Sequence, residues 1–324
     1  MSLEQHGAAP LEVTLALGGG AARGLAHIGV IRVLEAHGVA VRGVAGTSIG
    51  AIVGGLHCAG RLDAYEAYMR GLDARGFLRL LDPVVKQAGL LGGARVTRQL
   101  SEMVGDADVA GPPVPFTAVA TDLHTGAEVR LRSGSLVDAM RASWAIPGVF
   151  TPVRLDGRWL VDGGVSMPVP VGAARELAPE LPVIAVNLNN TALAFRGSLE
   201  DPPVADESAR ELSRMERLFQ RLRGMRAPGS PNGDRAPGMV TSVSDSVTHL
   251  EHKITSFQLA ADPPELLLEP AVFGVGLFDF HRAAPLIEAG AECARNAVRD
   301  GRLSALAARV RRGELPLRSP PAPR

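Results

Sequence analysis

The chain has 324 residues, and 46% of them are hydrophobic, which is enough to bury a large core in one α/β domain or in two smaller ones. Its 34 basic residues balance its 34 acidic residues, so no overall field attracts nucleic acid, and we expect no nucleic-acid partner. The 2 cysteines are too few for a disulfide framework or a cysteine zinc site, so we expect a reducing compartment, the cytoplasm, and neither a metal nor another cofactor.

The N-terminal segment, residues 1–10, has no cationic stretch followed by an apolar one. We therefore expect a flexible N-terminus rather than a secretory signal. The longest uncharged run, residues 44–60, is shorter than the roughly 20 residues that a membrane-spanning helix needs. Any membrane contact is therefore expected to be peripheral.

The first predicted elements form a βαβα unit. Residues 13–17 are a short apolar strand pattern, which the glycine run 18–20 ends. A helical pattern follows from about residue 24 to residue 37, with Gly38 where a left-handed C-cap is expected. A second β-branched run then leads to Ser48, and a further helix follows. This order predicts parallel strands whose glycine-rich loops lie at one edge of the sheet.

Ser48 stands between Gly46 and Gly50 at the end of the second predicted strand, flanked directly by Thr47 and Ile49. This spacing is typical of a nucleophile elbow, a strand-turn-helix corner with no room for bulky side chains beside its apex. Free amides at the start of the next helix favour negative charge near the serine oxygen. We predict that Ser48 is a nucleophile; the alternative is a serine that only caps the helix.

The glycine-rich loop 18–24 is the expected source of hydrogen-bond donors for a tetrahedral adduct on Ser48, because glycines let amides approach a substrate oxygen closely. Arg23 in the first helical turn opposes the helix dipole, which suggests a nearby anion; the alternative is a solvated side chain. Nucleotide-binding patterns fail, because Ala21 or Arg23 replaces a required glycine and Leu25 stands where a phosphate-binding loop needs lysine.

The proton acceptor for Ser48 is not fixed by spacing. No histidine has a convincing setting, and we expect His27 to be a packed polar residue more often than a base. Asp122 and Asp162 each end a predicted strand, and turn formation alone explains either aspartate. Gly163 and Gly164 let the chain turn away after Asp162, which leaves its carboxylate accessible.

The later elements continue the sheet. Residues 116–121 and 182–188 predict buried strands, with a helix near residues 136–144 between them. Two short strand patterns flank Asp156 and Gly157, a pair that favours a type I′ hairpin turn.

Residues 191–247 change to Pro, Gly, Ser, Arg and acidic residues, and we predict a mobile insertion there. Its one amphipathic stretch, 209–225, either lies on a membrane surface or packs on the core. Ordered pattern resumes over residues 250–257 and 265–268 and in a final helix from about His281.

Several segments together resemble the patatin-like phospholipases, in particular bacterial members near the neuropathy target esterase branch. These segments are residues 18–30, 46–50, 120–123, 141–150, 161–164 and 262–264. The resemblance covers about residues 12–300, apart from the insertion. It implies a three-layer α/β/α fold with a mainly parallel central sheet, in one domain over residues 11–312, followed by a disordered tail over residues 313–324.

The resemblance also implies a Ser-Asp dyad, in which Ser48 attacks an ester carbonyl and Asp162, favoured over Asp122 by this analogy, accepts its proton without a histidine. Ala21 stands where the family usually has a third glycine. The donor segment would consist of Gly19, Gly20, Ala21, Ala22, Arg23 and Gly24.

The activity implied is cleavage of carboxylic ester bonds in phospholipids, lysophospholipids or related lipids, so a lipid ester is the expected partner. Two alternatives stay open: a non-catalytic lipid-binding or regulatory protein, and an acyltransferase that uses an acceptor other than water.

Overall fold

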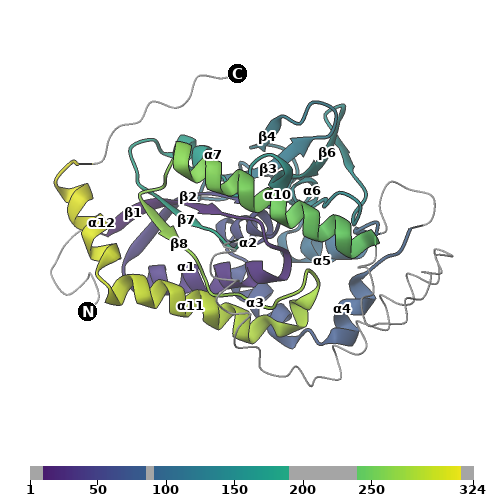
Figure 1. Ribbon diagram of the computed structural model, residues 1–324, viewed down its shortest axis with the longest axis horizontal. Coiled ribbons are helices and arrows are strands. Elements are labelled where there is room, and N and C mark those ends of the chain that lie inside the picture. Colours follow the sequence, from purple (N-terminus) through teal and green to yellow (C-terminus); the bar gives the residue numbers. More distant parts are fainter. Residues whose placement is uncertain (1–9, 85–90, 190–238, 315–324) are drawn as a thin grey trace, which may run out of the picture.

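The computed structural model describes residues 10–84, 91–189 and 239–314 (Figure 1). Within these ranges one sheet has the strand order β5-β6-β3-β2-β1-β7-β8, with β4 paired to β3 outside this path. The strands are β1 (Leu11–Leu17), β2 (Val39–Thr47), β3 (Phe116–Asp122), β4 (Glu128–Leu131), β5 (Val153–Leu155), β6 (Arg158–Asp162), β7 (Val183–Val186) and β8 (Leu266–Leu268). Strands β1, β2, β3, β7 and β8 run parallel, and β4, β5 and β6 join antiparallel. The predicted mainly parallel sheet is confirmed.

Helices cover both faces of the sheet, which gives the predicted three layers (Figure 1). The face with α1, α2 and α11 buries the larger apolar core, and the face with α7 and α10 buries a smaller one. The helices are η2 (Ala21–Leu25), α1 (Ala26–Ala36), α2 (Ile49–Cys58), α3 (Leu62–Gly71), α4 (Ala74–Leu80), α5 (Ala94–Val104), α6 (Leu136–Ser143), η3 (Gly163–Val165), α7 (Val171–Leu177), α10 (Met239–Ala261), η4 (Asp279–Arg282), α11 (Ala283–Arg299) and α12 (Arg302–Arg311).

The parallel pairing of β1 with β2 brings the two glycine-rich loops to one edge, as predicted. Leu17, the last residue of β1, pairs with Gly46 near the end of β2. The loop after β1 and the corner after β2 therefore lie side by side, at the carboxyl ends of neighbouring strands.

The hairpin of β5 and β6 determines where the second glycine pair lies. Asp156 and Gly157 have φ values of 48° and 79°, which are the positive angles of the predicted type I′ turn. The returning strand β6 runs antiparallel to β3, with Asp162 opposite Ala120. The end of β6 therefore reaches the same edge as the corner after β2.

Much of the predicted insertion lies outside the described residues, including its amphipathic stretch 209–225. The same is true of most of the predicted N-terminal segment and tail. Helix α10 begins at Met239, inside the range assigned to the insertion. Sequence pattern predicted order only from residue 250, because Ser, Thr and Val, which have modest helix propensity, fill the first half of this helix. None of the helices in the described ranges combines the length and hydropathy that crossing a bilayer requires.

A buried ionic network joins α7 to the start of strands β7 and β8. Arg175 of α7 contacts Glu265 at 2.9 Å and Asp262 at 3.3 Å, and it donates to the carbonyl of Pro263 at 3.1 Å. The second oxygen of Glu265 accepts the Val183 amide at 2.7 Å. Helix α7, the end of α10 and strands β7 and β8 are thereby joined through one guanidinium.

We expect Arg175→Met to lower the free energy of unfolding by about 3–5 kcal/mol, because it leaves the carboxylate of Glu265 buried without its cation. Urea unfolding followed by circular dichroism measures the change. The control is Arg295→Met on α11, which removes exposed ion pairs and should cost less than about 1 kcal/mol. Equal losses of stability in the two variants would contradict the assignment of a buried ionic network to Arg175.

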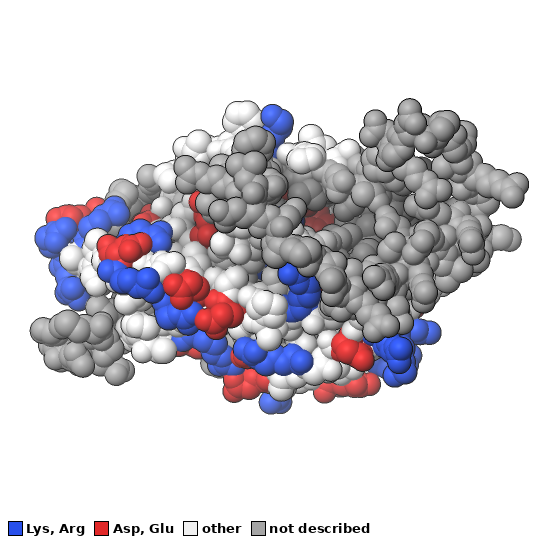
Figure 2. Space-filling view, turned by 60° about the horizontal axis from the view of Figure 1, so that its bottom comes forward, with Lys and Arg blue, Asp and Glu red and all other residues white. Residues whose placement is uncertain are grey.

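Figure 2 shows basic and acidic side chains interspersed over one face of the molecule, as the balanced charge leads one to expect.

Candidate active site

Ser48 occupies a sharp corner between β2 and α2. Its φ of 56° and ψ of −123° are unusual for a residue with a side chain. A Cβ at Gly46 would collide with the carbonyl of Gly50, and a Cβ at Gly50 would collide with the carbonyl of Leu17. Close backbone contact therefore requires glycine at both positions. The corner places Ser48 at the edge of the sheet, directly after β2.

The hydroxyl of Ser48 lies against the carboxylate of Asp162. Ser48 Oγ donates a hydrogen bond to Asp162 Oδ2 at 2.6 Å, and the two residues are only 5% and 3% exposed. Asp162 Oδ1 accepts the Gly164 amide at 2.7 Å, and Thr121 Oγ1 donates to the Asp162 carbonyl at 2.9 Å. The structure thus brings together the predicted nucleophile and the predicted base, and a second hydrogen bond holds the carboxylate of Asp162.

Asp122, the other aspartate that the sequence left open, lies in a turn. Its Oδ1 accepts the amides of His124 and Thr125 at 2.9 and 3.0 Å. These backbone hydrogen bonds, the one from Thr125 above all, lower the pKa of Asp122. Turn formation therefore accounts for Asp122.

Ser143 at the end of α6 forms hydrogen bonds with the backbone of the Ser48 corner and of β3. The Ser48 amide donates to Ser143 Oγ at 2.9 Å, and Ser143 Oγ donates to the carbonyl of Val119 at 2.5 Å. Its hydroxyl thus bridges the corner to β3. This serine lies in one of the segments that resemble the family, but no local signal predicts its role, because its partner lies 95 residues away along the chain.

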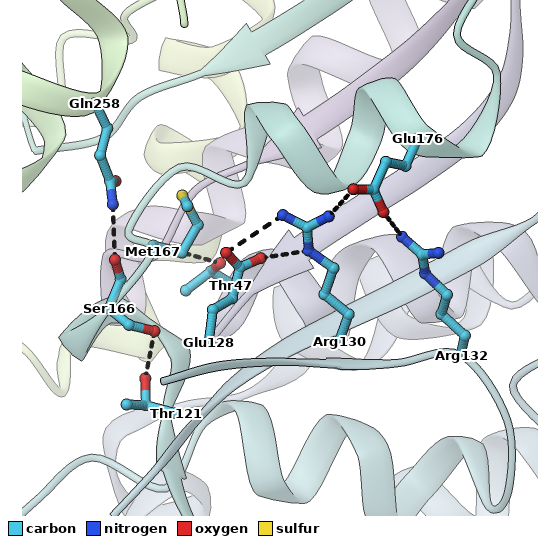
Figure 3. A network of polar contacts seen from close by, with 9 residues as sticks. All are labelled: Thr47, Thr121, Glu128, Arg130, Arg132, Ser166, Met167, Glu176 and Gln258. Carbon is cyan, nitrogen blue, oxygen red and sulfur yellow. Dashed lines mark hydrogen bonds and ion pairs between the residues drawn. The ribbon is translucent and has the colours of Figure 1, made fainter. Parts of the chain in front are cut away.

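The other residues flanking the dyad hold the backbone in place. Thr47 Oγ1 donates to the carbonyl of Met167 at 2.8 Å (Figure 3). Ile49 is buried against Gly24, where a Cβ would collide with it. A Cβ at Gly163 would likewise collide with the carbonyl of Val119. These contacts explain the small residues at both glycine positions.

Only part of the predicted donor loop has amides available for a substrate. The amides of Gly19, Ala22 and Arg23 donate to the carbonyls of Pro168, Leu277 and Gly20. Among the described residues, no acceptor takes the amides of Gly20 and Ala21. The loop also borders the predicted nucleophile, since a Cβ on Gly19 would lie 3.5 Å from Ser48 Cβ. Ala21 itself has a φ of 50°, a conformation that glycine adopts more easily.

Arg23 and His27 are both turned into the protein. Arg23 Nε donates to the carbonyl of Gly20 at 3.1 Å; burial lowers the pKa of Arg23, and the carboxylate of Glu251 opposes that shift. The acidic group that acts on Arg23 is thus an internal one, the carboxyl of Glu251. His27 is fully buried, donates from Nε2 to the carbonyl of Gly18 at 2.8 Å, and has its pKa lowered to about 4 by burial. It is neutral and packs behind the loop.

An apolar cavity, open to solvent on one side, begins at Ser48 and Ala21. Its walls come from α2, α3, α4, α5, the segment after α6 and the region around η4. They include Ile52, Tyr65, Met69, Leu72, Phe77, Leu100, Met103, Trp144, Phe150, Phe278 and Phe280. These residues could not be predicted from the sequence, because apolar side chains at helical spacing also make an ordinary core. In the described ranges, no group of three or more His, Cys, Asp or Glu side chains is arranged to hold a metal ion.

Comparison with known proteins points to one family. A family model described as "Patatin-like phospholipase" matches residues 15–175, which include Ser48 and Asp162. The "Uncharacterized NTE family protein Rv1063c" of Mycobacterium tuberculosis is 45% identical over 190 residues, which cover 59% of this chain and 52% of that protein. A second one, Rv2565, is 30% identical over 299 residues, covering 88% of this chain and 46% of the relative.

A mouse relative, "Patatin-like phospholipase domain-containing protein 6", is 32% identical over 185 residues, covering 55% of this chain and 14% of that protein. The chain spans about half the length of the mycobacterial relatives that it matches.

Proposed function

This chain belongs to the patatin-like phospholipase family, whose model matches its residues 15–175, and we propose that it is a serine acyl hydrolase acting on lipid esters. The proposal rests on one observation: Ser48 Oγ donates a hydrogen bond of 2.6 Å to Asp162 at the mouth of an apolar cavity. Phospholipids, lysophospholipids and related lipids with a carboxylic ester bond are the substrate class.

In the proposed reaction, Ser48 Oγ attacks the ester carbonyl while Asp162 accepts the Ser48 proton. Burial raises the pKa of Asp162 to about 6, which makes it a stronger base than an ordinary aspartate. The carboxylate is still weak toward an alcohol, so the proton must move in concert with the attack. The proton then passes to the departing alcohol, and a water molecule activated by Asp162 hydrolyses the acyl-Ser48 ester.

The negative charge that develops on the substrate oxygen needs donors. The amides of Gly20 and Ala21 support this role, because no described acceptor takes them, the preceding Gly19 borders Ser48, and Ala21 lines the same cavity as Ser48. Loss of one such donor typically costs on the order of 3 kcal/mol in the transition state. Much of the rate acceleration is therefore assigned to the loop.

The cavity supports a long acyl chain as the group transferred to Ser48. Each methylene group buried in an apolar site contributes about 0.8 kcal/mol. We expect Met69→Trp, which fills part of the cavity, to lower kcat/KM for p-nitrophenyl palmitate at least about tenfold and to leave p-nitrophenyl acetate within about twofold. Leu123→Trp, at a position that is 48% exposed, is the control and should change neither rate. An equal loss for both esters would contradict this use of the cavity.

A panel of lipid esters, assayed with wild type and Ser48→Ala, tests the proposed function. We expect fatty acid release that depends on Ser48. Lipid binding that survives the substitution, with wild-type turnover no faster than buffer, would instead indicate a non-catalytic lipid-binding protein. A labelled acyl chain that ends on an acceptor other than water would indicate an acyltransferase.

A further inference from the structure

A second carboxylate, that of Glu251 on α10, borders the proposed base. Its Oε1 lies against Gly164, so that a Cβ on this glycine would collide with it. That Cβ position is 3.0 Å from Glu251 Cδ and 3.1 Å from Asp162 Oδ1. The Gly164 amide is also the donor to Asp162 Oδ1 at 2.7 Å. The two carboxylates therefore lie on the same side of one glycine.

Helix α10 is held over the loop that follows Asp162. Gln258 Nε2 donates to the carbonyl of Ser166 at 2.7 Å (Figure 3), and Asn189 Nδ2 donates to Glu251 Oε2 at 3.3 Å. Thr255, between them on the helix, is buried. Residues 251, 255 and 258 are spaced to share one helix face. This face turns the carboxylate of Glu251 inward, although the residue as a whole is only half-buried.

Three groups face Glu251 from the elements packed around it. Asp162 comes from the end of β6, Arg23 from η2, and the amide of Asn189 from the segment after β7. Burial, with a smaller effect of Asp162, raises the pKa of Glu251 to about 8, while Arg23 and Asn189 act in the opposite direction. The two carboxyls therefore ionise in two steps: the pair holds one negative charge near neutral pH and two in more alkaline solution.

We propose that Glu251 is a positioning residue for ester hydrolysis, which acts through Asp162 by placing a second negative charge next to this base. The inference rests on the proposed function. During attack, negative charge leaves Asp162 and develops on the substrate oxygen near Gly20 and Ala21. An ionised Glu251 repels the negative charge on the neighbouring Asp162, so it favours the movement of that charge from Asp162 to the substrate oxygen. The Ser48 proton still goes to Asp162, and Glu251 forms and breaks no bond.

The test is the pH profile of kcat/KM for a neutral p-nitrophenyl ester. Wild type should show a rise near pH 6, as Asp162 ionises, and a second rise of at least about threefold near pH 8, as Glu251 ionises. Glu251→Gln keeps the shape of the protonated side chain and should keep the first rise and lose the second. Asn189→Ala removes a donor that favours the ionised form and should move the second rise to higher pH.

The matched control is Gln258→Ala, which removes the hydrogen bond between α10 and the loop after Asp162 without a change in charge. It should keep both rises. A second rise that persists in Glu251→Gln would overturn the inference. A second rise that is lost in Gln258→Ala as well would also overturn it, because the position of α10 and not the charge of Glu251 would then be the cause. A wild type without Ser48-dependent turnover would instead overturn the proposed function.

Stability supplies a readout that does not need activity. A buried acid with a raised pKa binds its proton more tightly in the folded chain, so its contribution to stability falls as pH rises from its unfolded pKa to its folded pKa. For Glu251 that window runs from 4.5 to about 8. Glu251→Gln should therefore melt at a higher temperature than wild type at about pH 9, by a margin that shrinks toward about pH 5. A margin that does not change with pH would contradict the assigned titration.

Discussion

Asp162→Asn is expected to remove ester turnover and at the same time to stabilise the folded protein. An amide cannot accept the Ser48 proton, and loss of the base of a hydrolytic site lowers kcat by about four orders of magnitude. The gain in stability follows from burial, which raises the pKa of Asp162 from 3.8 to about 6. The folded state thus binds this proton more tightly than the unfolded state. Ionised Asp162 therefore lowers stability above about pH 6, by on the order of 2–3 kcal/mol.

Two measurements at several pH values check this prediction. Asp162→Asn should melt above wild type at about pH 8, and this advantage should disappear at about pH 4, where both side chains are neutral. Wild-type turnover should fall as pH drops through about 6. Asp122→Asn is the control, because its side chain only closes a turn, and it should keep turnover within about twofold. Similar turnover in the two variants would exclude Asp162 as the base.

Gly50→Ala is expected to have the largest effect on folding. The added Cβ would collide with the carbonyl groups of Leu17 and Gly18, and backbone atoms in a sheet cannot move aside cheaply. We expect the free energy of unfolding to drop by more than about 3 kcal/mol, with loss of activity. Gly71→Ala is the matched control, since the corresponding Cβ at the end of α3 meets nothing within 4 Å. It should be neutral or stabilise by up to about 1 kcal/mol.

Urea unfolding of both glycine variants measures the difference directly. If Gly50→Ala were as stable as Gly71→Ala, the tight corner between β2 and α2 would not be the structure of this protein in solution.

The parts of the fold that the sequence predicts are those with local signals. The corner at Ser48, the turn at Asp156 and Gly157 and the βαβα order each depend on residues close together in the chain. The choice between Asp122 and Asp162 has no such local signal, because it depends on the antiparallel pairing of β6 with β3. Spacing therefore left both aspartates open.

The rest of the candidate site comes from distant segments. Glu251 reaches Gly164 from a helix that the sequence pattern predicted only in part, and the cavity is assembled from segments spread over most of the chain. The charge argument at Arg23 predicted a nearby acidic group, and the carboxyl of Glu251 is the group that acts on it. No local sequence signal indicates that this group is internal and lies beside the proposed base.

The central claim is that Ser48 is an activated nucleophile, and reaction of the intact folded chain with a fluorophosphonate probe, followed by mass spectrometry of the peptides, tests it most directly. We expect one adduct per chain, on Ser48, absent in Ser48→Ala and formed more slowly as pH falls below about 6. A folded wild-type chain that takes no label at Ser48, or lipid ester turnover that persists in Ser48→Ala, would contradict it.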